Sequence, residues 1–194
     1  MDKTVECACL KDVHANKNEQ SAGILALVAS CGLILLYGEI FGSESLTQVH
    51  LFLHEAYFVH KLPPPKVFVY DDACHLAMYL LNRLGRFGTS VVAVFLIQME
   101  KVRFVVDRFH WLNHTGLWCK RNVNPGTCDA LKKKSNTEAA EITFSWLHHY
   151  KAIVKHMNKA RYNFIMLWLF HERNVWLAAQ QEGQSQCGDV DDDE

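Results

Sequence analysis

Two adjacent carboxylates, Asp71 and Asp72, are the residues of this chain best placed to do chemistry, because they directly follow a short apolar run. Residues 66–70 have the composition of a buried strand, and residues 73–83 that of the helix after it. Ligands of an α/β sheet bind beyond the carboxyl ends of its strands, so we expect Asp71 at the edge of a cleft. A carboxylate there could bind a divalent cation for phosphate chemistry. The alternative is that either aspartate only caps the helix.

Two further acidic positions could act with this one. Asp107 follows a second apolar run, residues 102–106, and Glu141 lies in the first turns of a predicted helix. Cleavage of a phosphodiester by two divalent ions needs carboxylates from separate elements, because the ions bind both the attacking and the leaving oxygen. Glu141 shares a helical side with Phe144, so we expect it to point inward. The alternative for Glu138 or Glu141 is a favourable interaction with the positive start of the helix.

A group of histidines and cysteines forms a second candidate site. His110, His114, Cys119 and Cys128 follow the spacing H-x3-H-x4-C-x8-C. These ligand types suit tetrahedral zinc, and the intervening lengths allow the chain to close around an ion. The four residues are therefore candidate ligands of a structural zinc ion, and the other interpretation is that they are unliganded side chains in a loop, as cysteines and histidines in loops often are.

The seven cysteines do not indicate a disulfide framework. Their number is odd, their spacing is uneven, and residues 1–20 are polar and of mixed charge, unlike a cleavable leader. This pattern favours a nuclear or cytoplasmic protein over a secreted one. Cys74 precedes His75, but adjacent side chains of a helix point about 100° apart. We therefore expect Cys74 to be a buried structural cysteine and not a nucleophile paired with His75.

The elements that must position these residues can be read from the apolar pattern. The chain has 194 residues, of which 49% are hydrophobic, as expected for one globular domain. Residues 21–38 carry no charge and could span a bilayer as a helix. Glycines at positions 23, 32 and 38 divide the run into pieces of strand length, so we predict a buried hairpin with a turn at Cys31 and Gly32, and keep the membrane span as the alternative.

Helices and strands are expected to alternate along the rest of the chain. Ser45 and Gln48 form a capping box for a helix that ends before the prolines at 63–65. Strands are predicted at 66–70 and 102–106, helices at 73–83, 89–99 and 136–177, and a Cys/His-containing loop or insertion at 113–135. This order predicts an α/β sheet flanked by helices, in a single domain over residues 1–177.

The charges are distributed unevenly although they nearly cancel overall. Residues 100–174 carry 13 basic and 6 acidic side chains, whereas residues 175–194 carry 6 acidic and no basic ones. The basic region could follow a phosphate backbone, with ordinary solvated surface as the alternative. Residues 178–194 are expected to form an acidic disordered tail.

Short motifs follow one another in a fixed order along nearly the whole chain. They are Lys11-Asp12-Val13-His14-Ala15-Asn16, Ser21-Ala22-Gly23, Cys31-Gly32, Gly42-Ser43-Glu44-Ser45, Tyr70-Asp71-Asp72-Ala73-Cys74-His75, Val106-Asp107-Arg108-Phe109-His110-Trp111, Asn113-His114-Thr115-Gly116, Asn136-Thr137-Glu138-Ala139-Ala140-Glu141 and Asn163-Phe164. In this combination the chain resembles, up to about residue 174, the transposases of the Kyakuja, Dileera and Zisupton group, the KDZ superfamily, which is related in fold to other RNase H-like DDE enzymes.

The resemblance implies an RNase H-like mixed sheet flanked by helices, in a domain that binds DNA and cuts or joins its strands with Mg²⁺ or Mn²⁺. Asp71 would be the second acidic residue of the catalytic triad, and Glu141 the third. Asp107 and His110 would match the family's D-x-x-H element, with a structural or metal-supporting role. DNA is the implied partner, and no membrane is expected.

One departure from the family concerns the first acidic residue. The family places it in a central strand before the motif that starts at Lys11, and we expect this chain to start too late to contain it. Residues 4–10 could take the place of that strand, with Asp12 as the substitute ligand. The resemblance therefore predicts a transposase-derived domain, truncated at its amino terminus and descended from a metal-dependent DNA-cleaving and strand-transferring enzyme. The alternatives are a non-catalytic module that binds DNA or protein, and a single-span membrane protein.

Overall fold

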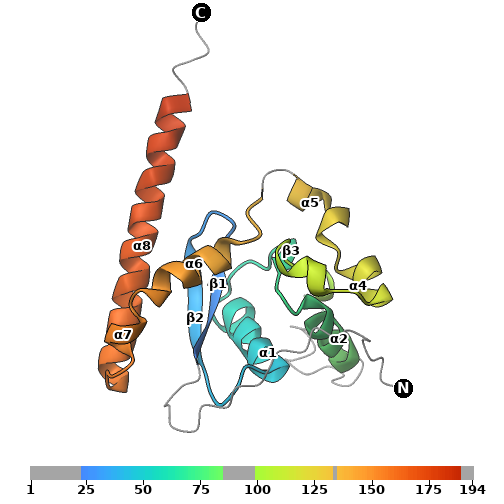
Figure 1. The fold of residues 1–194 in the computed structure, drawn as a ribbon, viewed down its shortest axis with the longest axis horizontal. Coiled ribbons are helices and arrows are strands. Elements are labelled where there is room, and N and C mark those ends of the chain that lie inside the picture. Colours follow the sequence, from blue (N-terminus) through green and yellow to red (C-terminus); the bar gives the residue numbers. More distant parts are fainter. Residues whose placement is uncertain (1–22, 85–98, 133–134, 189–194) are drawn as a thin grey trace, which may run out of the picture. The chain divides into compact units, whose positions relative to one another are not determined.

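The computed structural model describes residues 23–84, 99–132 and 135–188, and these form a mixed α/β structure (Figure 1). They fall into two compact units. The first contains residues 23–25 and the described part of 37–138, and the second contains residues 26–36 and 139–188. The motifs at 11–22 and most of the helix predicted at 89–99 lie outside the described residues.

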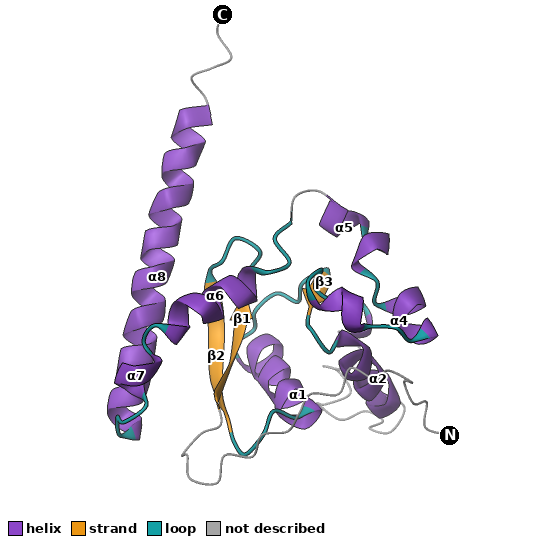
Figure 2. Ribbon diagram, viewed as in Figure 1, coloured by secondary structure: helices purple, strands orange, loops and turns teal. Residues whose placement is uncertain are grey.

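A hairpin precedes the first helix, as the glycine pattern predicts. Strands β1 (Gly23–Val28) and β2 (Ile34–Ile40) pair in a two-stranded sheet, coloured orange in Figure 2. The turn between them is closed by the N–H of Gly32, which donates to the carbonyl of Ala29 at 2.8 Å. Gly32 has φ +93°, a conformation that favours glycine. Among the described residues, no helix has the length and apolar character needed to cross a membrane.

Helix α1 (Leu46–His54) begins where the capping box predicts. The hydroxyl of Ser45 accepts a hydrogen bond from the N–H of Gln48 at 3.4 Å. The amide oxygen of Gln48 accepts from the N–H of Phe41 at 2.8 Å, which fixes the chain as it enters the helix. A single π-helical turn, η1 (Glu55–Val59), continues α1 toward the prolines.

The two strands predicted on either side of the next helix form a small parallel sheet. β3 (Val67–Val69) pairs with β4 (Arg103–Val105) in parallel. Helix α2 (Ala73–Leu84) leaves β3 and contacts both β4 and α1. Because parallel strands end at the same edge of a sheet, Asp71 and Asp107 both follow the carboxyl edge of this pair.

The segment predicted as a loop or insertion, 113–135, is largely helical. After η2 (His110–Asn113) it contains α4 (Leu117–Asn122), η3 (Pro125–Thr127) and α5 (Asp129–Lys132). These helices are too short to show an apolar period, but buried cysteines hold them to the core. Fully or almost fully buried side chains of this unit include Leu53, Ala73, Cys74, Leu76, Val105, Val106, Cys119 and Val123.

Helices make up most of the second unit, as the sequence predicts. They are α6 (Ala139–His148), α7 (Lys151–Val154) and the long α8 (Lys159–Gly188). The side-chain amide of Asn174 on α8 binds the backbone of Ile34 twice, accepting from its N–H at 2.9 Å and donating to its carbonyl at 2.8 Å. The guanidinium of Arg173 lies 4.5 Å from the centre of the Trp146 ring, which joins α8 to α6.

Candidate functional site

Asp71 is held in a defined position beyond the end of β3. It is partly buried, and its carboxylate accepts a hydrogen bond from the N–H of Asp72 at 2.8 Å. Its backbone carbonyl lies 2.9 Å from Nε2 of His114, a residue 43 positions further along the chain. The position of Asp71 therefore depends on a long-range contact as well as on the strand before it.

Negative charge is concentrated around the end of β3. The hydroxyl of Tyr70 donates to the carboxylate of Glu44 at 2.6 Å. Burial raises the pKa of Tyr70 far above its usual value, and the charges of Glu44, Asp71 and Asp72 raise it further. The sequence does not predict a role for Glu44 in the site, although this residue lies in one of the motifs of the resemblance. Oxygen ligands in such a group suit a hard divalent cation.

Asp107 and His110 interact with each other. Asp107 is buried, with 5% of its surface exposed. One carboxylate oxygen accepts from the backbone N–H of His110 at 2.9 Å, and the other lies 2.8 Å from its Nδ1. The adjacent N–H of Arg108 donates to the hydroxyl of Thr137 at 3.5 Å. The D-x-x-H element thus forms a local turn whose carboxylate engages the histidine.

A buried Cys/His group with the ligand types that suit zinc lies next to Asp71. Cys74, His114 and Cys119 are all buried, and their potential ligand atoms lie within 4.8 Å of one another. The thiol sulfur of Cys74 is 3.6 Å from Nδ1 of His114. Burial lowers the pKa of His114, against the opposite effect of its contact with the Asp71 carbonyl, and so favours the neutral ring that binds metals.

Only two of the four residues of the predicted zinc group lie together in the structure, and a third residue from another element joins them. The structure brings His114 and Cys119 together and adds Cys74. Among the described residues, the groups of potential metal ligands contain neither His110 nor Cys128. The side chain of Cys128 packs with apolar residues, among them Val105 and Leu131. The spacing does not predict Cys74, because this residue lies on α2, 40 residues before His114, and the two side chains meet only in the folded chain.

The predicted burial of Cys74 is confirmed, but the expectation that its side chain points away from His75 is wrong. The sulfur of Cys74 lies 3.7 Å from Nδ1 of His75. The ring of His75 turns back toward Asp72, whose carboxylate it contacts through the same nitrogen. Asp72, Cys74 and His75 therefore form a second group whose ligand atoms lie within 4.8 Å of one another, and Cys74 belongs to both groups.

Glu141 lies in the first turn of α6, as predicted, but its side chain is exposed. The expected inward orientation is wrong because α6 buries Ala139 and Thr143 instead. The hydroxyl of Thr143 donates to the carbonyl of Ala139 at 2.8 Å. Glu141 belongs to the second unit and Asp71 to the first, so their joint role stays a prediction.

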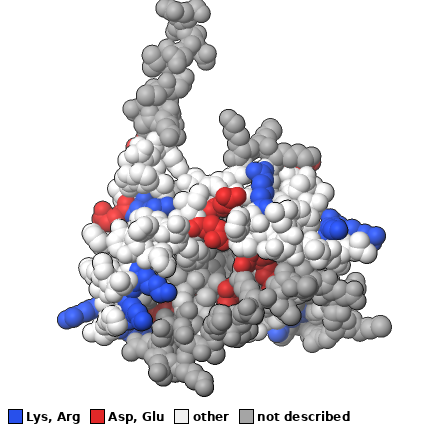
Figure 3. All heavy atoms as spheres, viewed as in Figure 1, with Lys and Arg blue, Asp and Glu red and all other residues white. Residues whose placement is uncertain are grey.

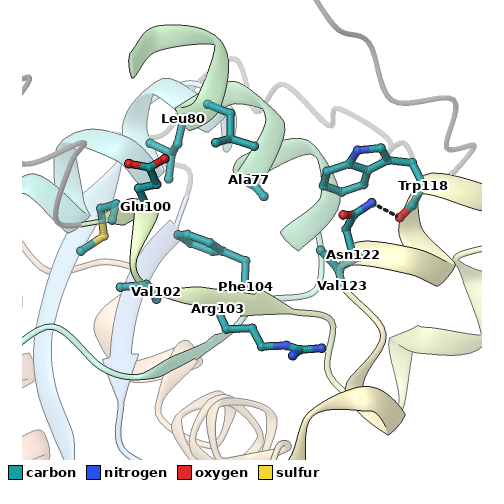
Figure 4. A pocket seen from close by; sticks show the side chains of 11 residues that line it. Ala77, Leu80, Glu100, Val102, Arg103, Phe104, Trp118, Asn122 and Val123 are labelled. Carbon is teal, nitrogen blue, oxygen red and sulfur yellow. Dashed lines mark hydrogen bonds between the residues drawn. The ribbon is translucent and has the colours of Figure 1, made fainter. Parts of the chain in front are cut away.

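A pocket of about 200 Å³ lies elsewhere in the first unit, between α2, β4 and α4 (Figure 4). Its lining is mainly apolar, and Leu80, Phe104 and Trp118 contribute to it. The amide of Asn122 donates to the carbonyl of Trp118 at 2.8 Å at its wall. None of the predicted site residues lines this pocket.

Lys and Arg side chains are exposed on the face drawn in Figure 3, alongside acidic and neutral surface. Binding of a phosphate backbone by the basic excess of residues 100–174 stays a prediction.

Fold and site together define a mixed α/β protein in which a Cys/His group compatible with zinc lies beside strand-end carboxylates. The family profile described as Kyakuja-Dileera-Zisupton transposase, KDZ, matches residues 6–174. The chain therefore belongs to the KDZ transposase family, as the motifs predicted. Neither the search of curated proteins nor the search of solved structures gave a match.

Proposed function

We propose that this chain is a transposase-derived domain of the RNase H-like type, whose ancestral reaction is metal-dependent cleavage and transfer of DNA strands. The observation that carries the proposal is the parallel β3–β4 pair with Asp71 beyond its carboxyl edge, in a chain of the KDZ family. Ligands of α/β sheets bind at that edge. DNA as the partner and the nucleus or cytoplasm as the compartment belong to the same proposal.

The residues present fit a divalent cation of the Mg²⁺ or Mn²⁺ type. The charges of Glu44, Asp71 and Asp72 all act on the buried phenol of Tyr70, so carboxylate oxygens are plentiful there. In the proposal Asp71 and Glu141 would hold the cation, which when bound would activate the attacking hydroxyl and stabilise charge on the phosphate. Asp71 is suited to this role because its backbone is fixed by β3 and by His114.

Calorimetry with Mn²⁺ on the full chain tests this assignment. Asp71→Asn keeps the size of the side chain and its acceptor for the N–H of Asp72, but removes the charge. We expect this variant to lose Mn²⁺ binding and Glu141→Gln to weaken it. Glu172→Gln removes an exposed carboxylate on α8 and is the matched control. Unchanged binding in Asp71→Asn would exclude Asp71 as a metal ligand.

A non-catalytic module that binds DNA or protein is the second candidate. The basic excess of residues 100–174 and the engagement of Asp107 by His110 favour it, since neither requires a reaction. A supercoiled plasmid assay with Mn²⁺ separates the two functions. Metal-dependent nicking that Asp71→Asn abolishes supports the enzyme. Salt-dependent DNA binding without nicking supports the binding module.

A further inference from the structure

We propose that Cys74, His114 and Cys119 bind a structural Zn²⁺ ion, whose fourth ligand comes from the paired side chains of Asp72 and His75. This site uses neither Asp71 nor Glu141, the proposed ligands of Mg²⁺ or Mn²⁺, although Asp72 lies near both sites, and it does not depend on the DNA reaction. It also differs from the zinc group predicted from spacing, because Cys74 takes the place of His110 and Cys128.

The distance between the ligand atoms of Cys74 and His114 matches that of a zinc site, and the sulfur of Cys119 lies within 4.8 Å of both. In a tetrahedral centre with Zn–S of about 2.3 Å and Zn–N of about 2.0 Å, sulfur and nitrogen lie about 3.5 Å apart. The sulfur of Cys74 is 3.6 Å from Nδ1 of His114. Cys74 and Cys119 are 0% exposed and His114 is 4% exposed. Three soft or borderline ligands therefore meet in a closed interior.

His114 is oriented as zinc-binding histidines usually are. Its Nε2 lies 2.9 Å from the carbonyl of Asp71, which can only accept a hydrogen bond, so the proton is placed on Nε2. The unprotonated Nδ1 then faces Cys74. The ring of Trp111 stacks on His114 with an angle of 6° between the planes, which restricts its rotation. A backbone carbonyl on the second ring nitrogen is the usual outer contact of a metal-binding histidine.

The fourth ligand can come from the group formed by Asp72, Cys74 and His75. The sulfur of Cys74 lies 3.7 Å from the carboxylate of Asp72 and 3.7 Å from Nδ1 of His75. Asp72 and His75 also contact each other, so one of them can bind the ion while the other orients it. The other four side chains thus converge on Cys74, near the start of α2.

Cys128 provides an internal comparison. It is as deeply buried as the other two cysteines, with 2% of its surface exposed, but it packs with Val105 and Leu131 in an apolar cluster. Burial alone therefore does not account for the surroundings of Cys74 and Cys119. A zinc ion at these residues would join α2 to α4 and, through His114, would fix the backbone of Asp71.

The test uses the purified full chain, with zinc content from elemental analysis and binding of Co²⁺ followed by its absorption spectrum. We expect about one zinc per chain, and a tetrahedral Co²⁺ spectrum with thiolate-to-metal charge-transfer bands. Cys119→Ser and His114→Gln should each weaken Zn²⁺ binding by more than about 100-fold in a chelator competition. Cys128→Ser should bind Zn²⁺ as the unchanged chain does.

Two results would overturn the proposal. One is a wild-type chain without zinc and without a tetrahedral Co²⁺ spectrum, a measurement that needs no variant to fold. The other is loss of zinc in Cys128→Ser equal to that in Cys119→Ser, which would restore the group predicted from spacing. Asp71→Asn should keep zinc whether or not it loses Mn²⁺, so failure of this site and failure of the proposed function can be told apart.

Discussion

Asp107 offers a quantitative test of whether the D-x-x-H element is structural. Its carboxylate accepts from the N–H of His110 at 2.9 Å and lies 2.8 Å from the ring Nδ1. A hydrogen bond to a charged group contributes about 1.5–3 kcal/mol. The contact between the Asp107 carboxylate and the His110 ring contributes less to stability, because 28% of the His110 side chain is exposed to solvent. Asp107→Ala should therefore lower the free energy of unfolding by about 3 kcal/mol, which corresponds to a Tm lower by about 6–12 °C.

Asp107→Asn separates this role from metal binding. Asparagine can still accept from the N–H of His110 and can donate to a neutral ring, so we expect a loss of only about 1 kcal/mol. Urea unfolding followed by circular dichroism measures both variants, with Glu172→Ala on the exposed face of α8 as the control. If Asp107→Ala changes the unfolding free energy by less than about 0.5 kcal/mol, the buried carboxylate does not hold the turn and the reasoning fails.

Three further changes test other parts of the structure. Asn174→Ala removes both bonds to Ile34 and should cost about 1–3 kcal/mol, with faster amide exchange at Ile34 measured by mass spectrometry; an unchanged exchange rate would contradict this. Gly32→Ala places a side chain at φ +93° and should lower the free energy of unfolding by about 1–2 kcal/mol, measured by thermal unfolding. Gly126→Ala is the control and should lower it less, because Gly126 does not have a positive φ. Burial lowers the pKa of His50 from 6.5, so the unfolded chain binds a proton at this residue more readily than the folded chain does. The free energy of unfolding should therefore decrease as the pH is lowered below about 6.5. Urea unfolding at pH values above and below 6.5 should show a smaller decrease in His50→Gln.

The elements that could be predicted are those fixed by local signals. The hairpin follows from glycines that interrupt an apolar run, and Gly32 does occupy the turn with a positive φ. Helix α1 begins at Leu46 because the hydroxyl of Ser45, its cap, accepts from the N–H of Gln48, while the Gln48 amide oxygen accepts from the N–H of Phe41 and fixes the chain before the helix. The strand ends before Asp71 and Asp107 are likewise marked by a change from apolar to charged residues, and the structure places them within one or two residues of the predictions.

What could not be predicted depends on contacts between distant segments. Spacing along the chain groups His114 with His110, Cys119 and Cys128, whereas its contact Cys74, a proposed zinc ligand, lies on a helix 40 residues earlier. The hydrogen bond from Tyr70 to Glu44 joins residues 26 positions apart, and no pattern in either segment predicts it. Glu141 was assigned an inward direction from Phe144, but Ala139 and Thr143 proved to be the buried side of α6.

The two hydrogen bonds between Asn174 and Ile34 limit how far the carboxyl-terminal end of the chain can be shortened. An amide side chain there occupies backbone groups at the start of β2 that would otherwise be open to another strand. Uncovered strand edges recruit neighbouring molecules and lead to aggregation. The match to the family ends at residue 174. A protein that ends before residue 174 would lose both hydrogen bonds to Ile34, and we expect it to aggregate more readily through the exposed edge of β2.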